Sequence, residues 1–137
     1  MRTCTRKLEF DAAHRVMKHE SKCRNLHGHR YTVEVTCGIE HLDGLGRVID
    51  FGVIKQVFGA WLDEALDHGC VLNKQDNELI QLCIAQGWKV FLMDDNPTAE
   101  CMSELLHKKA VELLEPLGVQ VTTIKLYETP NCWSVYP

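Results

Sequence analysis

Residues 27–39 alternate between two kinds of side chain over the length of a long β-strand. Successive side chains of a strand point to opposite faces of a sheet, so only one register puts the apolar row in a core. That register also places two histidines on the core face, where buried imidazoles need partners. The core-facing row reads His27, His29, Tyr31, Val33, Val35, Cys37 and Ile39.

A third histidine, His14, follows residues 2–11, which also alternate and predict a strand that ends near this position. Three imidazole nitrogens leave one position of a tetrahedral zinc open, which is the pattern of catalytic sites. The ordinary alternative is that these histidines bind no metal and are either exposed to water or hydrogen-bonded within the core, because histidine is also a common polar side chain. Cys23 lies close enough in sequence to reach the same pocket without being a ligand.

The composition indicates one globular domain over residues 1–137. A formal net charge of −4 argues against a general binder of nucleic acid or of anionic membranes. No apolar run approaches the ~20 residues of a membrane span, and the first residues lack the apolar stretch of a secretory signal. The seven cysteines form no CxxC pair, so we expect a reducing, cytoplasmic location.

The remaining pattern predicts an α+β fold. We expect a helix after Asp50, a helix over 76–86, a strand within 88–93 and a helix that begins with Asn96 as its cap. Two further strands, 119–128 and 132–136, complete a four-stranded antiparallel sheet with helices on one face. Such a sheet has two edges, and pairing between copies of the chain would cover them.

Six motifs occur in an order that resembles the 6-pyruvoyl-tetrahydropterin synthase superfamily. Three residues separate the cysteine from the His-x-His pair, as in its bacterial 6-carboxy-5,6,7,8-tetrahydropterin synthase subgroup. The segment 74–95, between the Leu-Asn and Pro-Thr-Ala-Glu motifs, is longer than the corresponding segment of the shortest family members. The motifs are Phe10-Asp11-Ala12-Ala13-His14, Cys23-x-x-x-His27-Gly28-His29, Val48-Ile49-Asp50-Phe51-Gly52, Leu66-Asp67-His68 with Leu72-Asn73, Pro97-Thr98-Ala99-Glu100 and Tyr127-Glu128-Thr129.

The resemblance implies a tunnelling fold, in which the sheets of several copies join edge to edge into an oligomeric barrel, here expected to be a homohexamer. It implies sites between subunits, and Zn²⁺ held by His14, His27 and His29. The implied reaction is that of a lyase in queuosine biosynthesis. It converts the small molecule 7,8-dihydroneopterin triphosphate to 6-carboxy-5,6,7,8-tetrahydropterin, with release of acetaldehyde and triphosphate.

The same resemblance implies roles for further residues. Cys23 would be the catalytic base, and Asp67 with His68 its proton relay. Glu128, also counted as catalytic, would anchor the guanidine-like edge of the pterin, while Thr98 and Glu100 would line the site. From the residues alone, Asp67 and His68 could simply end a helix, and Glu128 could be an acid emerging into solvent.

Basic residues around residues 15–30 could bind the triphosphate, or could form an ordinary solvated loop. Arg24 is the one that we expect to touch the substrate. Two other functions stay open: triphosphate elimination to 6-pyruvoyl-tetrahydropterin, and a non-catalytic subunit that binds zinc or pterin. The basic residues are Arg15, Lys18, Lys22, Arg24 and Arg30.

Overall fold

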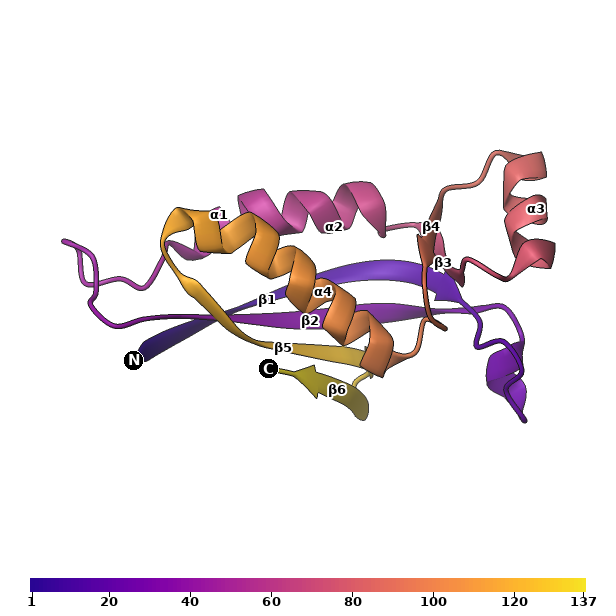
Figure 1. Cartoon of the computed structure of the whole chain (residues 1–137), viewed down its shortest axis with the longest axis horizontal. Helices are drawn as coiled ribbons and strands as arrows, with labels where there is room; N and C mark the ends of the chain where they lie inside the picture. The colour runs from indigo at the N-terminus through magenta and orange to yellow at the C-terminus, as the bar shows by residue number, and fades with distance from the viewer.

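The computed structural model describes all residues 1–137 and is built on one six-stranded sheet (Figure 1). The strands lie in the order β4-β3-β1-β2-β5-β6. Their bounds are Arg2–His14 for β1, His27–Ile39 for β2, Gly69–Asn73 for β3, Val90–Met93 for β4, Gln120–Thr129 for β5 and Cys132–Tyr136 for β6.

The prediction of four antiparallel strands was wrong for one side of the sheet. Strands β1, β2, β5 and β6 do pair antiparallel, but β3 runs parallel to β1, and β4 runs parallel to β3. The strand expected within 88–93 is confirmed as β4, although its place in the sheet was not predicted, and β3, with only five residues, is too short for alternation to reveal it. Helical crossovers precede each of them, and such connections make parallel neighbours.

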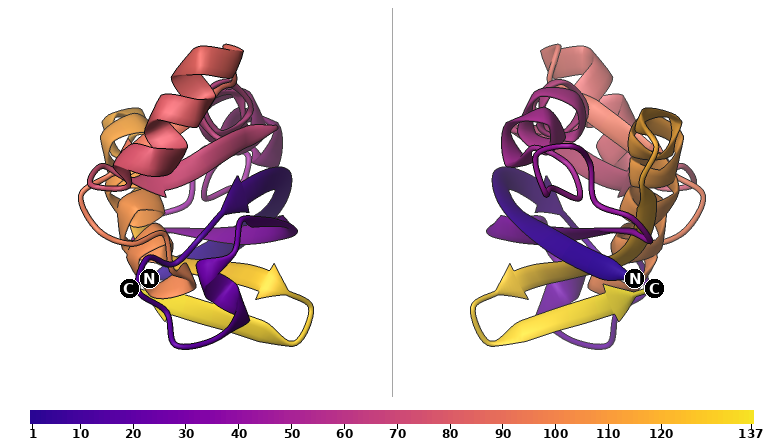
Figure 2. Two further views of the ribbon diagram at one scale, coloured as in Figure 1. Left: turned by 90° about the vertical axis from the view of Figure 1, so that its right-hand side faces the viewer. Right: turned by 90° about the vertical axis from the view of Figure 1, so that its left-hand side faces the viewer.

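Helices cover one face of the sheet, as Figures 1 and 2 show. Asp50 caps the first of them as predicted, since its Oδ1 accepts from Gly52 N–H at 2.7 Å. That helix consists of α1 (Phe51–Ile54), a π-helical segment (Lys55–Gly59) and α2 (Ala60–Ala65). The longest helix, α4 (Ala99–Leu114), crosses the same face and ends in the short η3 (Glu115–Leu117).

The cap of α4 corrects the sequence prediction. Thr98 is the cap, and its hydroxyl accepts from Cys101 N–H at 3.2 Å. Asn96 instead donates to the backbone carbonyl of Met17 at 3.1 Å and pairs with Asn73. Asn96 therefore ties three segments together rather than starting a helix.

Helix α3 (Asn77–Gln86) lies apart from the other helices, within the long segment 74–95 (Figure 1). Asp76 caps its start, and Gly87 ends it in a left-handed conformation with φ of 69°, as the sequence predicted. The helix packs through Leu79 and Cys83 against Leu72 of β3. The segment thus adds a small second cluster beside the main core.

The main core lies between the sheet and the helices. Strands β1 and β2 pair over thirteen residues, with His14 opposite His27 and Phe10 opposite Tyr31. The other face of the sheet is polar, and no helix covers it (Figure 2). No helix combines the length and the apolar character needed to cross a bilayer. The largest fully buried side chains are Tyr31, Phe10, Phe58, Ile54, Leu62, Leu66, Leu72, Met102, Leu106, Leu114, Ile124 and Leu126.

A candidate metal centre and a separate Asp-His pair

Three histidines and one glutamate meet at one end of the sheet. His14 ends β1, His27 and His29 begin β2, and Glu128 lies near the end of β5. One ligand atom from each lies within 4.8 Å of the others. The ring centroids of the histidines are 4.7 to 5.1 Å apart, so the three rings surround a common point.

Backbone carbonyls fix which nitrogen of two of these rings carries a proton. The Nδ1 of His14 lies 2.7 Å from the carbonyl of Pro97, and the Nδ1 of His27 lies 2.7 Å from that of Asn25. A carbonyl can only accept, so each Nδ1 donates and each neutral ring keeps its Nε2 lone pair free. These two bare nitrogens face one another at 3.2 Å.

The convergence of acceptors fits a bound cation. Glu128 Oε1 lies 3.0 Å from His29 Nε2 and 3.8 Å from His14 Nε2. His29 Nε2 is buried and has no well-aligned hydrogen bond. Tetrahedral zinc with Zn–N bonds of 2.0–2.1 Å separates its nitrogens by about 3.3 Å, close to the observed spacing. The donor set and its spacing therefore suit zinc.

The protonation state of the cluster also suits a metal. Burial lowers the pKa of His14 and of His29, although the charge of Glu128 opposes this effect in both. Neutral imidazole is the form that binds metal. The buried Tyr31 also helps to orient His14, because its hydroxyl lies 3.2 Å from His14 Nδ1. Such partners of a ligand orient its ring and restrict its tautomer.

The loop that precedes α4 contributes through its backbone. Pro97 is buried, and its carbonyl holds His14. Thr98 uses its hydroxyl to cap α4, and Glu100 is exposed, with its side chain in no recorded hydrogen bond or ion pair. The structure thus places this motif beside the histidine cluster, and the proposed contacts of Thr98 and Glu100 with a ligand stay predictions.

Asp67 and His68 form a second, separate group at the end of α2. Asp67 accepts from Asp11 N–H at 2.8 Å and from His68 Nδ1 at 2.7 Å. Burial opposes ionisation of Asp67, but these hydrogen bonds prevail and lower its pKa. Because His68 donates through Nδ1, its Nε2 is free to exchange a proton. The His68 side chain is 77% exposed, in a left-handed conformation with φ of 61°.

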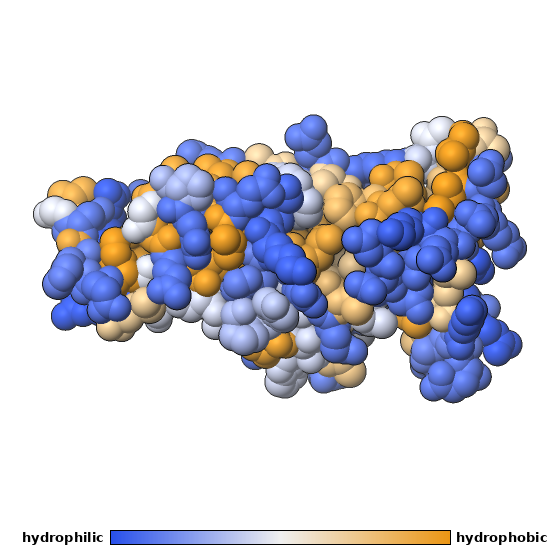
Figure 3. All heavy atoms as spheres, in the orientation of Figure 1, coloured by the Kyte–Doolittle hydropathy of each residue, from blue (hydrophilic) through white to orange (hydrophobic).

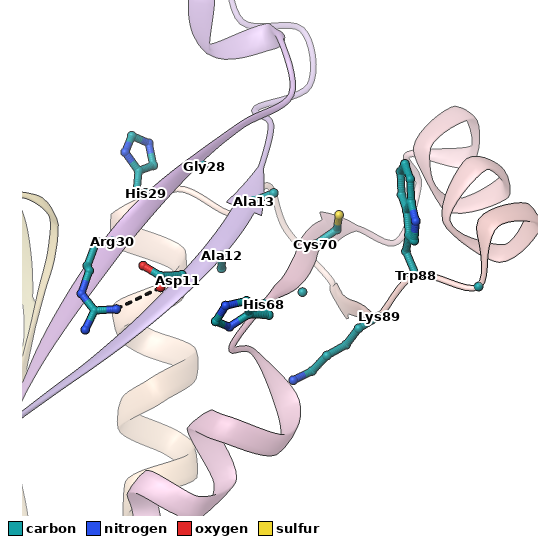
Figure 4. Close-up of a pocket in the computed structure, with 12 residues that line it drawn as sticks. Asp11, Ala12, Ala13, Gly28, His29, Arg30, His68, Cys70, Trp88 and Lys89 are labelled. Atoms are coloured by element: carbon teal, nitrogen blue, oxygen red, sulfur yellow. Dashed lines mark hydrogen bonds and ion pairs between the residues drawn. The ribbon is translucent and has the colours of Figure 1, made fainter.

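His68 lines a depression of about 690 Å³ (Figure 4). Asp11, Arg30 and His29 also line it, although the picture shows the His29 ring projecting away from the other three, on the other side of β2. Lys89 stabilises the end of α2, because its ammonium donates to the carbonyls of Asp63 and Asp67. Hydrogen bonds therefore hold Asp67 and His68 in place, and the exposed His68 side chain is accessible to a ligand or to a second chain.

Cys23 lies in the short η1 (Lys22–Arg24), within the loop between β1 and β2. It is half-buried, and the backbone bond from Val16 N–H to the Cys23 carbonyl, 2.9 Å long, holds its position. Its thiol belongs to neither the histidine cluster nor the Asp67–His68 pair. Arg24 is exposed beside it. Within one chain, therefore, Cys23, the histidine cluster and the Asp67–His68 pair do not form a single cluster of side chains.

Sequence reasoning missed the groups that orient the predicted ones. The carbonyls of Asn25 and Pro97 have no side-chain signature. Lys89 and Tyr31 read as ordinary surface and core residues. Asp11 offered a signal, because it stands in the motif before His14 and its backbone positions Asp67.

Comparisons with known proteins give relatives that match nearly the whole chain. The sequence model of the 6-pyruvoyl tetrahydropterin synthase family matches residues 3–137. A relative from Rickettsia bellii, named 6-carboxy-5,6,7,8-tetrahydropterin synthase, is 45% identical over 132 residues, which are 95% of this chain and 96% of that protein. A protein of the same name from Aquifex aeolicus is 31% identical over 150 residues, covering 93% and 92% of the two chains.

Solved structures share the fold. An uncharacterized protein from Wolinella succinogenes superposes with a TM-score of 0.87 at 22% identity, over 98% of this chain and 97% of that one. The 6-pyruvoyl tetrahydropterin synthase of Plasmodium vivax superposes with a TM-score of 0.70 at 17% identity, over 99% and 98%. The mixed sheet with its helical layer is therefore an architecture that these proteins have in common.

Replacing His27 by alanine should remove the metal. The substitution deletes one of two facing Nε2 lone pairs, and we expect the affinity for zinc to fall at least about 100-fold. Metal analysis after dialysis would measure the loss, with His41→Ala, a change at an exposed histidine, as the control. Full zinc retention in the His27→Ala protein would rule out this ligand set.

Proposed function

This chain belongs to the 6-pyruvoyl tetrahydropterin synthase family, and we propose that it is a 6-carboxy-5,6,7,8-tetrahydropterin synthase. It would convert 7,8-dihydroneopterin triphosphate and one water to the carboxylated pterin, acetaldehyde and triphosphate, in queuosine biosynthesis. The observation that carries the proposal is the convergence of three histidine nitrogens in a chain whose relatives, 45% and 44% identical, bear that name.

We propose that His14, His27 and His29 hold the zinc. A zinc ion held there would supply Lewis acidity toward hydroxyl or carbonyl oxygens of the substrate side chain. Pro97 and Asn25 keep two of the ligands in one tautomer through their carbonyls. The pocket is therefore organised before the substrate arrives, which reduces the cost of reaching the reactive geometry.

Glu128 is suited to recognise the pterin itself. A carboxylate accepts two parallel N–H bonds from a planar, guanidine-like edge. Its position against His29, 3.0 Å away, would place a pterin bound in this way directly beside the metal centre. Thr98 caps α4 and Glu100 lies in its first turn, directly after Pro97, whose carbonyl holds His14, and both would line the same cavity.

Proton transfer would fall to Cys23 and the Asp67–His68 pair. A base must come within hydrogen-bond reach of the carbon-bound proton, and Cys23 lies in the loop that joins two metal ligands. Other thiols are less suited, since burial raises the pKa of Cys37 and of Cys70 to about 11. The free Nε2 of His68 can pass the proton on, with Asp67 holding the ring.

These groups would meet only when chains assemble. Within one chain Cys23 belongs to neither group, and His68 is exposed. The outermost strands, β4 and β6, also carry exposed apolar side chains, namely Leu92, Trp133 and Val135. We therefore propose a homohexamer whose joined sheets form a barrel, with each site shared by two subunits.

The cytoplasm is the proposed location. All seven cysteines are free, as expected in a reducing compartment. The small-molecule substrate requires neither a nucleic acid nor a membrane partner. Triphosphate elimination to 6-pyruvoyl-tetrahydropterin is the second candidate, and the three-residue spacing between Cys23 and His27 favours the carboxy product over it.

Product analysis tests the reaction directly. Mass spectrometry of the zinc-loaded protein with 7,8-dihydroneopterin triphosphate should show 6-carboxy-5,6,7,8-tetrahydropterin, and trapping should detect acetaldehyde in equal amount. The pyruvoyl product without acetaldehyde would indicate the second candidate. Binding of the pterin without any turnover would indicate a non-catalytic subunit.

Cys23→Ala should keep its zinc and its fold but turn over about 10²–10⁴-fold more slowly, because the base is lost. Zinc content, melting temperature and rate, measured on one preparation, separate a base from a ligand and from a structural thiol. Cys132→Ala, at an exposed thiol, is the matched control and should keep its rate. Turnover near the wild-type level in Cys23→Ala would exclude the proposed role.

A site shared by two subunits should allow complementation. Cys23→Ala and His68→Ala proteins would each be inactive, but refolding them together should create some sites with both groups intact. Random mixing of equal amounts should restore roughly a quarter of the wild-type rate. A mixture as inactive as its components would mean that both groups act within one chain.

A further inference from the structure

The structure separates the basic residues of the first loop into neutralised and free ones. Arg15 is bound by Asp76, whose carboxylate is buried, and also approaches Glu78 at 3.6 Å. Its charge is therefore compensated. On the outer face of the sheet, Arg30 is compensated in the same way.

The partners of Arg30 are two acids of β1. Its guanidinium lies 2.7 Å from Glu9 and 2.9 Å from Asp11. Lys18 and Arg24, in contrast, take part in none of the recorded ion pairs. Two free cations thus remain on this loop, together with a third, Lys22, which does not line the depression that the other two share.

Lys18 and Arg24 line a common depression of about 320 Å³, together with Arg15, Met17 and Asn25. No carboxylate lines it. One water occupies about 30 Å³ of liquid, so the depression has room for a chain of phosphate groups. Figure 3 shows hydrophilic side chains gathered over this loop, at the lower right.

The backbone gives Lys18 a fixed position at the rim of this depression. Its φ is 62°, in the left-handed region that favours glycine or asparagine. The turn is closed by His19 N–H on the Val16 carbonyl, and Asn96 holds the Met17 carbonyl at 3.1 Å. A lysine at a position better suited to glycine, on a turn anchored from outside, points to a role for its side chain.

The depression adjoins the candidate catalytic groups. Asn25, on its wall, holds the metal ligand His27 through its carbonyl. Arg24 directly follows Cys23 in η1. An anion bound here would therefore lie beside both the metal centre and the proposed base.

We propose that Lys18 and Arg24 form the subsite that binds the triphosphate of the substrate. Arginine offers phosphate a bidentate fork and lysine a compact charge, so the two together suit a polyphosphate chain. This proposal rests on the proposed function, because the substrate carries its triphosphate on the side chain that reacts at the metal centre. Arg15 shapes the wall without contributing net charge.

Lys18→Gly gives the sharpest test, because glycine suits the left-handed backbone and should keep the melting temperature or raise it. We expect KM for 7,8-dihydroneopterin triphosphate to rise at least tenfold, with kcat changed less than threefold. Arg24→Met should behave similarly. The control Lys22→Met, a free cation outside the depression, should change KM less than twofold.

Binding measurements with two ligands distinguish this subsite from the part of the site that binds the pterin. Calorimetry with inorganic triphosphate should show at least tenfold weaker binding to Lys18→Gly, while dephosphorylated 7,8-dihydroneopterin should bind as it does to the wild type. Unchanged triphosphate binding in both variants, or equal loss with Lys22→Met, would overturn the subsite. Wild-type protein that binds triphosphate through these residues but makes no product would support the subsite and refute the proposed reaction.

Discussion

The antiparallel pairing of β1 with β2 is the constraint on which the site depends. The two strands pair without interruption over thirteen residues, and their core-facing rows end in His14 on one strand and His27 with His29 on the other. A slip of one residue would move every side chain of a strand to the opposite face. Burial of Phe10, Tyr31 and the valines of β2 therefore fixes the positions of the three histidines as well as the core.

This dependence explains what could be predicted from the sequence. The alternation of residues 27–39 is long enough to specify both the strand and the side of the sheet that its histidines occupy. Capping by Asp50 and termination at Gly87 are equally local signals. In contrast, the parallel pairing of β3 and β4 depends on contacts between distant segments, and neither strand is long enough to show a period.

The same distinction applies to the site. His14, His27 and His29 converge because the strand pattern brings them together, whereas within one chain Cys23 lies in neither the histidine cluster nor the Asp67–His68 group. For the segment 74–95, the sequence showed only that it is longer than the corresponding segment of the shortest family members, and did not indicate what it contacts. In the structure its Asp76 both caps α3 and binds Arg15, so this segment stabilises the loop between His14 and His27. This stabilisation depends on the ion pair between Asp76 and Arg15, two residues far apart in the sequence, which no motif spacing predicts.

The short connection between β1 and β2 also has a kinetic consequence. Closing a short loop costs less entropy than closing a long one, so neighbouring strands pair early during folding. The two strands that hold His14, His27 and His29 are joined only by residues 15–26, whereas β5 begins at Gln120. A nascent chain would therefore bring the three imidazoles together long before Glu128 arrives, and a metal ion held by them would cross-link β1 and β2 before the remaining strands add to the sheet.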